Sequence, residues 1–367
     1  MSNRLWTTFQ QLTSIYSPSY GERQFCDALR QKLTQLNISV YEDDADQIIK
    51  GNSGNLYGFL PGTLSGPPLL FSAHMDTVEP AKGKKPILHE DGTITSAGDT
   101  ILGADDAAGI TIILEAIARL KEQGIPHRTI ELVFPVAEER YGAGSAVIDY
   151  SRIRARDAYV LDLGGAIGEA ANAAPTILSF EIQIHGKAAH AGFAPREGIH
   201  AIEAAAKAIA RLPQGEPAPG FTFNIGRIEG GGAGNIVPAL CTVRGEMRSL
   251  DHKAVLAYWE TVKTVFHQEA ANIGAIADAK HKIELTAYET PLHTSVVERF
   301  ERACQKTGVP CHIHSTFGGS DQNNFALHGI NGLVIACSMH EVHSNREHSH
   351  LDELESGVKL VIALMTD

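Results

Sequence analysis

The sequence predicts an α/β protein with a mostly parallel sheet and an inserted α+β domain. Short apolar runs of strand length alternate with helical segments up to about residue 165, and this alternation returns after residue 295. Such an order is typical of a parallel sheet that helices cover on both faces. Between these parts, residues 177–287 follow the order βαββαβ, which is typical of a two-layer domain with an antiparallel sheet.

The first part of the chain contains apolar runs bounded by Gly and Pro, which indicate strands, and segments with a period near 3.6, which indicate helices. A long amphipathic helix begins near Asp106, because apolar residues recur at helical spacing from there to about Gly124. The expected helices are 3–16, 22–36, 106–124 and a short one after Gly144, and the expected strands are 38–41, 55–60, 69–73, 129–137 and 158–161, with a hairpin near 86–96.

The inserted part is expected to contain strands 176–185, 221–228, 240–247 and 282–287 and helices 198–212 and 251–273. The last part is expected to contain helices 295–306 and 351–364, strands 311–314 and 333–336, and a helix after Gln322. We therefore expect one domain formed by 1–176 and 291–367, with a second domain, 177–290, inserted into it.

Composition excludes several classes of protein. The net charge of −12, without a basic run to offset it, argues against a nucleic-acid binder. The N-terminal sequence has no apolar signal core and no eighteen apolar residues run together, so we expect a cytoplasmic protein without a membrane partner. Five cysteines, widely spaced and without a CxxC pair, indicate neither a disulfide framework nor a thiolate zinc site.

Polar residues directly follow several of the expected strands. His74 and Asp76 follow strand 69–73, Glu138 and Glu139 follow strand 129–137, and Asp162 follows strand 158–161. The carboxyl ends of parallel strands meet at one edge of a sheet, which is where ligands bind in such folds. Each residue alone has an ordinary explanation, such as a core histidine or a solvated turn, so the prediction rests on the whole set.

Two further stretches belong to this set. Asp105 and Asp106 lie at the beginning of the long helix, where one Asp could also be a simple N-cap. Histidines crowd between 340 and 350 after the last strand, and the HSxxE pattern favours His343 among them. So many carboxylates cannot stay ionised together without cations, because close like charges raise one another's pKa values. Imidazole and carboxylate ligands without thiolate suit zinc in a hydrolytic site, with cobalt or manganese as alternatives.

The motifs carry a family resemblance. They are His74-Met-Asp76, Leu102-Gly-Ala-Asp-Asp-Ala-Ala-Gly109, Glu138-Glu139, Asp162-Leu-Gly-Gly165 and His343-Ser-Asn-Arg-Glu347. In order and approximate spacing they resemble peptidase T, in the co-catalytic zinc exopeptidase family that also includes carboxypeptidase G, aminoacylase and succinyl-diaminopimelate desuccinylase. The resemblance covers nearly the whole chain.

The resemblance implies roles for the residues at the strand ends. His74, Asp105 and Asp162 would hold one divalent ion, and Glu139, His343 and the shared Asp105 would hold a second. Glu138 would be the general base and acid, and Asp76 would orient the His74 imidazole.

The inserted domain carries further matches, and the resemblance implies that it is a lid. His190, in Gly186-Lys-Ala-Ala-His-Ala-Gly192, would steady the oxyanion, in dimeric members from the neighbouring subunit. Asn235 and Arg248 would grip the substrate, Arg248 through a forked hydrogen bond to a terminal carboxylate. Gly319 and Asp321, in Gly-Gly-Ser-Asp, would form a loop on the substrate side. As ordinary alternatives, His190 is an exposed loop residue, Asn235 a turn residue and Arg248 a surface arginine.

The resemblance therefore implies a two-metal exopeptidase, most similar to peptidase T, that acts as an aminopeptidase on short di- and tripeptides and forms a homodimer through its lid domain. Alternatives with the same two-metal site are an N-acyl amino acid amidohydrolase and a carboxypeptidase. A metal-loaded binding protein and an acidic structural protein are the non-enzymatic alternatives.

Overall fold

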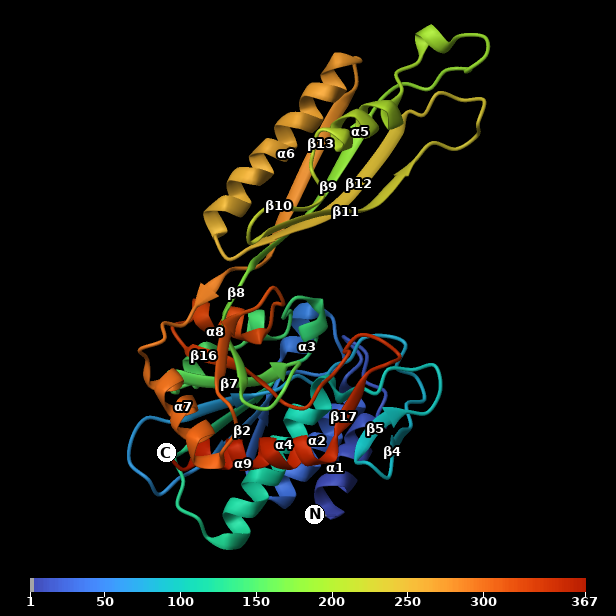
Figure 1. The fold of residues 1–367 in the computed structure, drawn as a ribbon. Coiled ribbons are helices and arrows are strands. Elements are labelled where there is room, and N and C mark those ends of the chain that lie inside the picture. The colour runs from blue at the N-terminus through green and yellow to red at the C-terminus, as the bar shows by residue number, and fades with distance from the viewer. Residues whose placement is uncertain (1–2) are drawn as a thin grey trace. The chain divides into compact units, whose positions relative to one another are not determined.

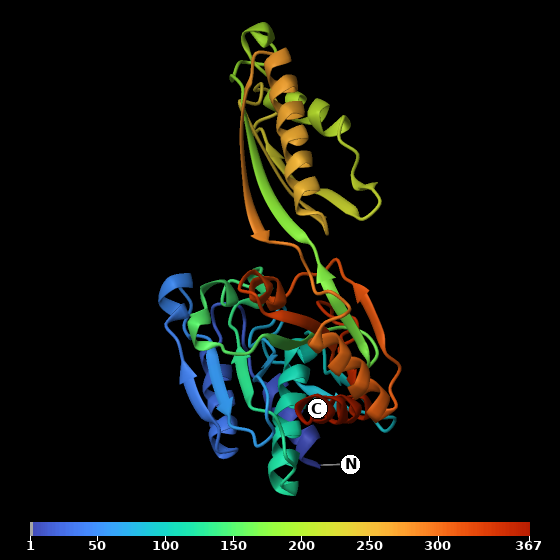
Figure 2. The ribbon, with the colours of Figure 1, turned by 90° about the vertical axis from the view of Figure 1, so that its left-hand side faces the viewer.

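The computed structural model describes residues 3–367 and divides into two compact units (Figures 1 and 2). The first unit contains the chain up to Ala173, Glu289–Thr316 and Ser320–Asp367, and the second contains Ala174–Tyr288 and Phe317–Gly319. The second unit is therefore almost entirely an insertion into the first.

Among the described residues, the first unit is built on a nine-stranded sheet with the order β1-β2-β6-β3-β7-β16-β8-β14, in which β15 also pairs with β8. The central strands β6, β3, β7 and β16 are parallel. On one side β2 pairs antiparallel with β6, and on the other β8 pairs antiparallel with β16. The strands are β1 (Ser39–Glu42), β2 (Leu56–Leu60), β3 (Leu69–Ser72), β6 (Ile130–Phe134), β7 (Asp157–Leu163), β8 (Glu169–Ala174), β14 (Tyr288–Glu289), β15 (His312–Ser315) and β16 (Asn331–Ala336).

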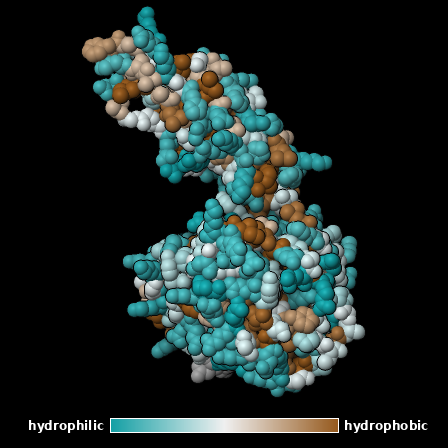
Figure 3. Space-filling model, turned by 180° about the vertical axis from the view of Figure 1, so that it is seen from behind, coloured by the Kyte–Doolittle hydropathy of each residue, from teal (hydrophilic) through white to brown (hydrophobic). Residues whose placement is uncertain are grey.

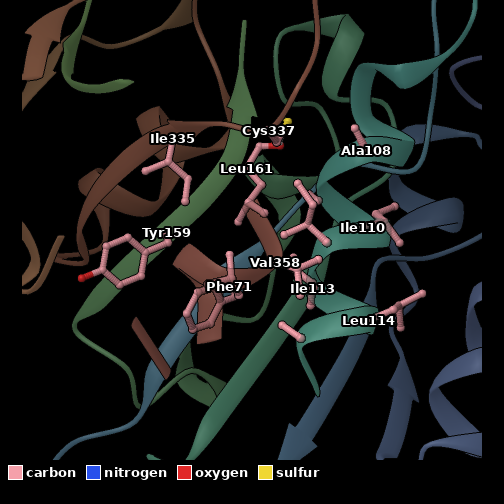
Figure 4. Packing of buried hydrophobic residues seen from close by; sticks show 14 of the residues in the cluster. Phe71, Ala108, Ile110, Ile113, Leu114, Tyr159, Leu161, Ile335, Cys337 and Val358 are labelled. Atoms are coloured by element: carbon pink, nitrogen blue, oxygen red, sulfur yellow. Dashed lines mark hydrogen bonds between the residues drawn. The ribbon is translucent and has the colours of Figure 1, made fainter. Parts of the chain in front are cut away.

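Helices cover this sheet (Figure 1). They are α1 (Asn3–Thr13), α2 (Arg23–Gln35), α3 (Ala45–Ile49), α4 (Ala104–Gln123), α7 (Ser295–Thr307), α8 (Asp321–Leu327) and α9 (Leu351–Met365). The α4 helix is buried along most of its length because apolar residues occupy nearly every face of it. Figure 4 shows Phe71, Ile113, Leu161 and Val358, from β3, α4, β7 and α9, gathered in one apolar core. This core supports the sheet edge to which the polar residues belong.

A small sheet with the order β17-β5-β4 lies in the same unit. Its strands are β4 (Pro86–Leu88), β5 (Thr93–Ser96) and β17 (His348–His350). The β4–β5 hairpin was expected, whereas β17 was not, because the sequence His-Ser-His carries no apolar residue. The short helix expected after Gly144 is a single 3₁₀ turn, Ser145–Val147.

The second unit is an antiparallel sheet with the order β10-β11-β12-β9-β13 and two helices on one face. Its elements are β9 (Thr176–His185), α5 (Ala201–Ala210), β10 (Gly215–Ala218), β11 (Phe221–Gly230), β12 (Leu240–Ser249), α6 (His252–Asn272) and β13 (Ile276–Leu285). Phe180, Phe223 and Trp259 are central to its own core. The predicted fold class is confirmed, with β10 as an additional short edge strand.

The surface of both units is mostly hydrophilic in the view of Figure 3, with small apolar areas scattered over it. Among residues 3–367, no helix combines the length and the apolar character that a membrane crossing requires.

Candidate metal centre and active site

Six of the expected side chains meet where the parallel strands of the first unit end. His74 follows β3, the pair Glu138-Glu139 follows β6, and Asp162 lies near the end of β7. The parallel register brings these strand ends to one edge of the sheet. We call the following residues the ligand cluster: His74, Asp105, Glu138, Glu139, Asp162 and His343.

Asp105 lies between the two imidazoles of the ligand cluster. Its Oδ1 is 2.9 Å from His74 Nε2, and its Oδ2 is 3.2 Å from His343 Nε2. His343 Nε2 is also 2.9 Å from Glu139 Oε1. One carboxylate therefore faces two separate groups of potential ligands, which is the arrangement required of a group shared by two ions.

The other carboxylates close the cluster around His74. Asp162 Oδ1 is 3.7 Å from His74 Nε2. The potential ligand atoms of His74, Glu138 and Asp162 lie within 4.8 Å of one another, as do those of His74, Asp105 and Glu139. The two groups have His74 in common, so donors for two neighbouring cations converge here.

Burial and mutual repulsion dominate the electrostatics of the ligand cluster. Burial raises the pKa of Glu138 and of Asp162 above the usual range and raises that of Glu139 to about 7. Hydrogen bonds to Asp105 and Glu139 raise the pKa of His343 to about 10. Protons thus offset the negative charge of this cluster, and a divalent cation can replace them. The donor set fits zinc, cobalt or manganese by its chemistry.

Asp76 organises the residues around it through its carboxylate. Its Oδ1 accepts a hydrogen bond from the backbone N–H of Glu138 at 2.8 Å, and its Oδ2 accepts bonds from the N–H of Glu139 at 3.3 Å and from Ser19 Oγ at 2.7 Å. The backbone carbonyl of Asp76 lies 2.9 Å from His74 Nδ1, and its Oδ1 lies 3.4 Å from the same atom. One residue therefore positions both the imidazole and the Glu138-Glu139 turn.

The capping role that the sequence left open for Asp105 belongs to Asp106. Its Oδ1 accepts from the N–H of Gly109 at 3.1 Å, and its Oδ2 accepts from the N–H of His74 at 3.1 Å. The backbone of Asp105 and Asp106 is not helical, so regular α4 begins after them. Asp106 thus fixes the beginning of the helix while Asp105 faces the cluster.

Two buried glutamates support the cluster, although no role was predicted for either of them. Glu347 accepts hydrogen bonds from the N–H groups of Gly103 at 2.7 Å and Asp105 at 3.0 Å. Glu22 Oε1 accepts from the N–H of Ala137 at 3.0 Å, next to Glu138. Glu347 is the last residue of the HSxxE pattern, so the sequence contains a pattern that points to it. Glu22 precedes an ordinary helix, and no sequence pattern indicates its role.

The residues expected to bind substrate in the second unit are all at or near its surface. His190 is exposed, and its Nδ1 accepts from the N–H groups of Gly192 at 3.1 Å and Phe193 at 3.2 Å. Asn235 is also exposed, and its carbonyl accepts from the N–H of Ala191 at 2.9 Å.

Arg248 is half-buried in the same unit. Its Nε donates to Glu246 Oε1 at 2.8 Å, and its Nη1 donates to the carbonyl of Phe317 at 3.0 Å. Gly319 belongs to this unit too, and a Cβ there would lie 2.3 Å from Leu285 Cδ1, so the end of that side chain would have to move for a larger residue.

Asp321 belongs to the first unit, at the beginning of α8, and is buried. Its Oδ1 has no hydrogen-bond partner among residues 3–367. Burial raises its pKa to about 7, and the Asp321 charge raises that of Glu138. Asp321 is therefore close enough to the ligand cluster to act on it electrostatically.

Comparison with known proteins gives matches over the whole chain. Residues 55–176 match the model of peptidase family M28, and residues 172–274 match that of the peptidase dimerisation domain. The crystal structure of aminopeptidase PepT from Bacillus cereus is 40% identical, with a TM-score of 0.92 over 99% of this chain and 97% of that one. A tripeptidase from Staphylococcus aureus is 32% identical, with a TM-score of 0.96 over the same shares.

Peptidase T from Pectobacterium atrosepticum is a more distant relative. It is 24% identical over 390 residues, which cover 94% of this chain and 90% of that protein. The expected resemblance is thus confirmed along the chain and at two levels of identity. The chain is a hydrolase that belongs to the peptidase T-like family.

Proposed function

We propose that the protein is a two-metal aminopeptidase that removes the N-terminal residue from di- and tripeptides. The observation that carries this proposal is the position of Asp105 between His74 and His343, with Glu138 buried beside them. The similarity to the aminopeptidase PepT of Bacillus cereus and to the tripeptidase of Staphylococcus aureus supports the same activity.

The ligand cluster would hold the two ions as the resemblance implies. His74, Asp105 and Asp162 would hold one, and Asp105, Glu139 and His343 the other; zinc is the first choice. When bound, such ions polarise a scissile carbonyl and lower the pKa of water. The protein itself supplies the shaped, buried surroundings and the groups that move protons.

Glu138 is the proposed proton carrier. Its backbone N–H is held by Asp76, which fixes the turn, and burial together with the Asp162 charge raises the pKa of its carboxyl. A carboxyl with a raised pKa can take a proton from the attacking water and return it to the leaving amine. Glu138 would therefore act first as base and then as acid.

His190 is suited to donate a hydrogen bond to the oxyanion. Because its Nδ1 accepts two backbone N–H groups, the neutral ring carries its proton on Nε2. That N–H is the kind of donor that stabilises a tetrahedral intermediate. Arg248 Nη2, which keeps no protein partner among residues 3–367, would bind the peptide carboxylate, with Asn235 and Gly319 contributing to the binding surface.

Asp321 would bind the free amino group of the substrate. Its Oδ1 is buried without a partner, and a buried carboxylate oxygen is stabilised by a cation. This assignment favours an aminopeptidase over a deacylase, since an N-acyl amino acid has no free amino group. In the alternative, an N-acyl amino acid amidohydrolase or a carboxypeptidase, Arg248 keeps its role because those substrates also end in a carboxylate.

The test is hydrolysis of di- and tripeptides and of N-acetyl amino acids by metal-stripped protein, before and after addition of zinc, cobalt or manganese. We expect metal to restore release of the N-terminal residue. The variant Glu138→Gln should lose about 10²–10⁴-fold in kcat while retaining its metal. Glu90→Gln, at an exposed position, is the matched control and should keep full activity.

The outcomes separate the candidate functions. Turnover of N-acetyl amino acids alone would establish the deacylase instead. Full activity of Glu138→Gln would rule out the proposed proton carrier. If the protein binds metal stoichiometrically but turns over no substrate, it is a metal-loaded binding protein. If it binds no stoichiometric metal, the acidic structural protein is the remaining alternative.

We further propose a homodimer formed through the second unit. The match of residues 172–274 to the peptidase dimerisation domain supports it. Light scattering coupled to gel filtration should give twice the monomer mass, and a monomer at micromolar concentration would contradict this proposal.

A further inference from the structure

Three histidines that the ligand cluster does not use lie together elsewhere in the first unit. The ring centres of His340 and His348 are 5.0 Å apart, those of His340 and His350 are 5.9 Å apart, and those of His348 and His350 are 5.7 Å apart. Glu353, in the first turn of α9, accepts or shares a proton with His340 Nε2 at 2.6 Å. We call these four residues the histidine triad site.

The backbone places these rings on a rigid support. His348 and His350 are two residues apart on β17, so their side chains point to the same face of the strand. His340 pairs with His348 through two backbone hydrogen bonds, of 3.0 and 3.1 Å, which bring its side chain beside them. The positions of the three Cβ atoms thus follow from strand geometry and not from a mobile loop.

Each ring has one nitrogen engaged by the protein and one nitrogen open. His340 Nε2 contacts Glu353, His348 Nδ1 lies 3.1 Å from the carbonyl of Arg346, and His350 Nδ1 lies 3.5 Å from Thr93 Oγ1. Within residues 3–367, the other nitrogen of each ring has no hydrogen-bond partner in the protein. An imidazole that binds a metal shows this pattern, with its second nitrogen oriented by a carboxylate or carbonyl.

The spacing of the rings also suits an ion. With Zn–N bonds of about 2.0–2.1 Å, imidazoles at tetrahedral positions have ring centres roughly 5 Å apart. The observed separations are 5.0 to 5.9 Å. The open nitrogens converge less tightly than the donors of the ligand cluster, so binding requires rotation of the rings. All three residues are half-exposed, so an ion in solution can reach their rings.

We propose that His340, His348 and His350 form a separate zinc-type site, with Glu353 orienting His340. Its fourth position would be left to water. The charge of Glu169, which acts on His340, adds to the attraction for a cation. This site is distinct from the ligand cluster, because His343 Nε2 faces Glu139 and Asp105.

The site would stabilise a loop that serves the proposed reaction. His340 and His348 flank the segment 341–347, which carries His343 and the cap residue Glu347. An ion held by both flanking histidines would join the two ends of this segment and restrict it. In this respect the inference rests on the proposed function, but occupancy of the site does not.

The test is the number of zinc ions bound by the full chain in a zinc-buffered solution, measured by elemental analysis. We expect the double variant His348→Asn/His350→Asn to bind one ion fewer than the wild type. The matched control is His312→Asn/His314→Asn, which removes an exposed pair with the same spacing on β15 and should lose no ion. Because the readout is a difference, it does not depend on how many ions the ligand cluster holds.

A second measurement guards against misfolding of the double variant. The single variant His350→Gln should bind its weakest ion at least about tenfold less tightly than the wild type, since even loss of an outer partner costs 10–100-fold in affinity. Metal stoichiometry and affinity equal to the wild type in both variants would overturn the proposal and leave a simple His340–Glu353 ion pair. Loss of peptidase activity with all ions retained would count against the proposed function and not against this site.

Discussion

Asp76 holds the Glu138-Glu139 turn of the candidate active site in place through its carboxylate. Its carboxylate accepts three hydrogen bonds, two of them from the backbone of Glu138 and Glu139. In Asp76→Ala these two buried or half-buried N–H groups lose their acceptor, which costs about 1–3 kcal/mol each when water cannot replace it. We therefore expect metal affinity and kcat to fall about 10–100-fold, as measured by metal titration and peptide hydrolysis.

Ser19→Ala is the matched control for this prediction, because it removes only the third hydrogen bond to Asp76. It should lower kcat much less than Asp76→Ala does. Equal effects of the two variants would mean that the backbone bonds contribute nothing.

Glu22 gives the protein a specific dependence of stability on pH. Burial and the charge of Asp76 raise its pKa from 4.5 to about 7 in the folded state. Between these two values the folded state binds more protons than the unfolded state, so this residue's contribution to stability is full below pH 4.5 and is lost as pH rises through 7. Each unit of difference in pKa corresponds to about 1.4 kcal/mol.

The variant Glu22→Gln keeps an oxygen for the N–H of Ala137 but does not titrate. In metal-free protein its free energy of unfolding, relative to the wild type, should increase by roughly 1–3 kcal/mol from pH 4.5 to pH 8. Urea unfolding across this range measures the difference. The free energy of unfolding of the exposed control Glu90→Gln should depend on pH as that of the wild type does. The same pH dependence for Glu22→Gln would refute the raised pKa of Glu22.

The strand-end rule located part of the ligand cluster from the sequence, because His74 and the pair Glu138-Glu139 follow strands and Asp162 lies near the end of one. His74, Glu138 and Asp162 each follow or end an apolar run, and the structure brings them together. Glu22 and Glu347 act on backbone groups that are 115 and more than 240 residues away in sequence. No local pattern encodes such a bond, so their roles become visible only in the folded chain.

At the scale of elements, the close contact of α4 with β7 determines where Asp105 and Asp106 lie. Gly109 is at this contact, and a Cβ there would lie 2.4 Å from Asp106 Oδ1 and 2.5 Å from the carbonyl oxygen of Leu161. Because neither backbone nor cap can easily move, Gly109→Ala should lower the free energy of unfolding by about 1–3 kcal/mol. It should also weaken metal binding, because the cap residue Asp106 directly follows Asp105 of the ligand cluster.

Gly357→Ala in α9 is the matched control. Its Cβ would meet Ile112 Cδ1 at 2.6 Å, the end of a flexible side chain that can rotate away. Denaturant unfolding should show a smaller loss for this variant. A loss as large as that of Gly109→Ala would show that general crowding, and not the α4–β7 contact, sets the cost.

The elements that the sequence missed are those without apolar alternation. The β8 strand, Glu169–Ala174, contains four alanines, and alanine has little preference for strands. It forms because β16 and β15 pair with it on its two sides. The β13 strand begins at Ile276, earlier than the expected residue 282, because pairing with β9 extends it through a polar stretch. Pairing with strands that are distant in the sequence thus determines these strands, because their local preference for strand structure is weak.

At the scale of the whole molecule, each unit has its own apolar core and one of the two tryptophans. Trp6 packs against the core of the first unit, and Trp259 is buried in that of the second. All residues of the ligand cluster belong to the first unit. A metal bound to that unit should therefore stabilise one core and leave the other unchanged.

Two variants make this measurable by fluorescence. In Trp259→Phe the signal reports the first unit, and in Trp6→Phe it reports the second. At a metal concentration of 100 times Kd, binding adds about 2.7 kcal/mol to the free energy of unfolding of the first unit. This corresponds to a rise in the Tm of that unit of roughly 5–10 °C. Only the Trp6 signal should show this rise. A common shift of both signals would mean that the two units unfold together.

The order of the strands in the chain has a consequence for synthesis on the ribosome. The β16 strand lies between β7 and β8 in the sheet but is translated after the entire α5–β13 segment. A nascent chain can therefore complete the fold of the second unit while β7 still lacks β16, one of its two parallel neighbours. Until Asn331–Ala336 leave the exit tunnel, the apolar edge of β7 stays open to pairing with other chains. Translation that stalls before Asn331 would release a chain with a folded insertion inside an incomplete and aggregation-prone host.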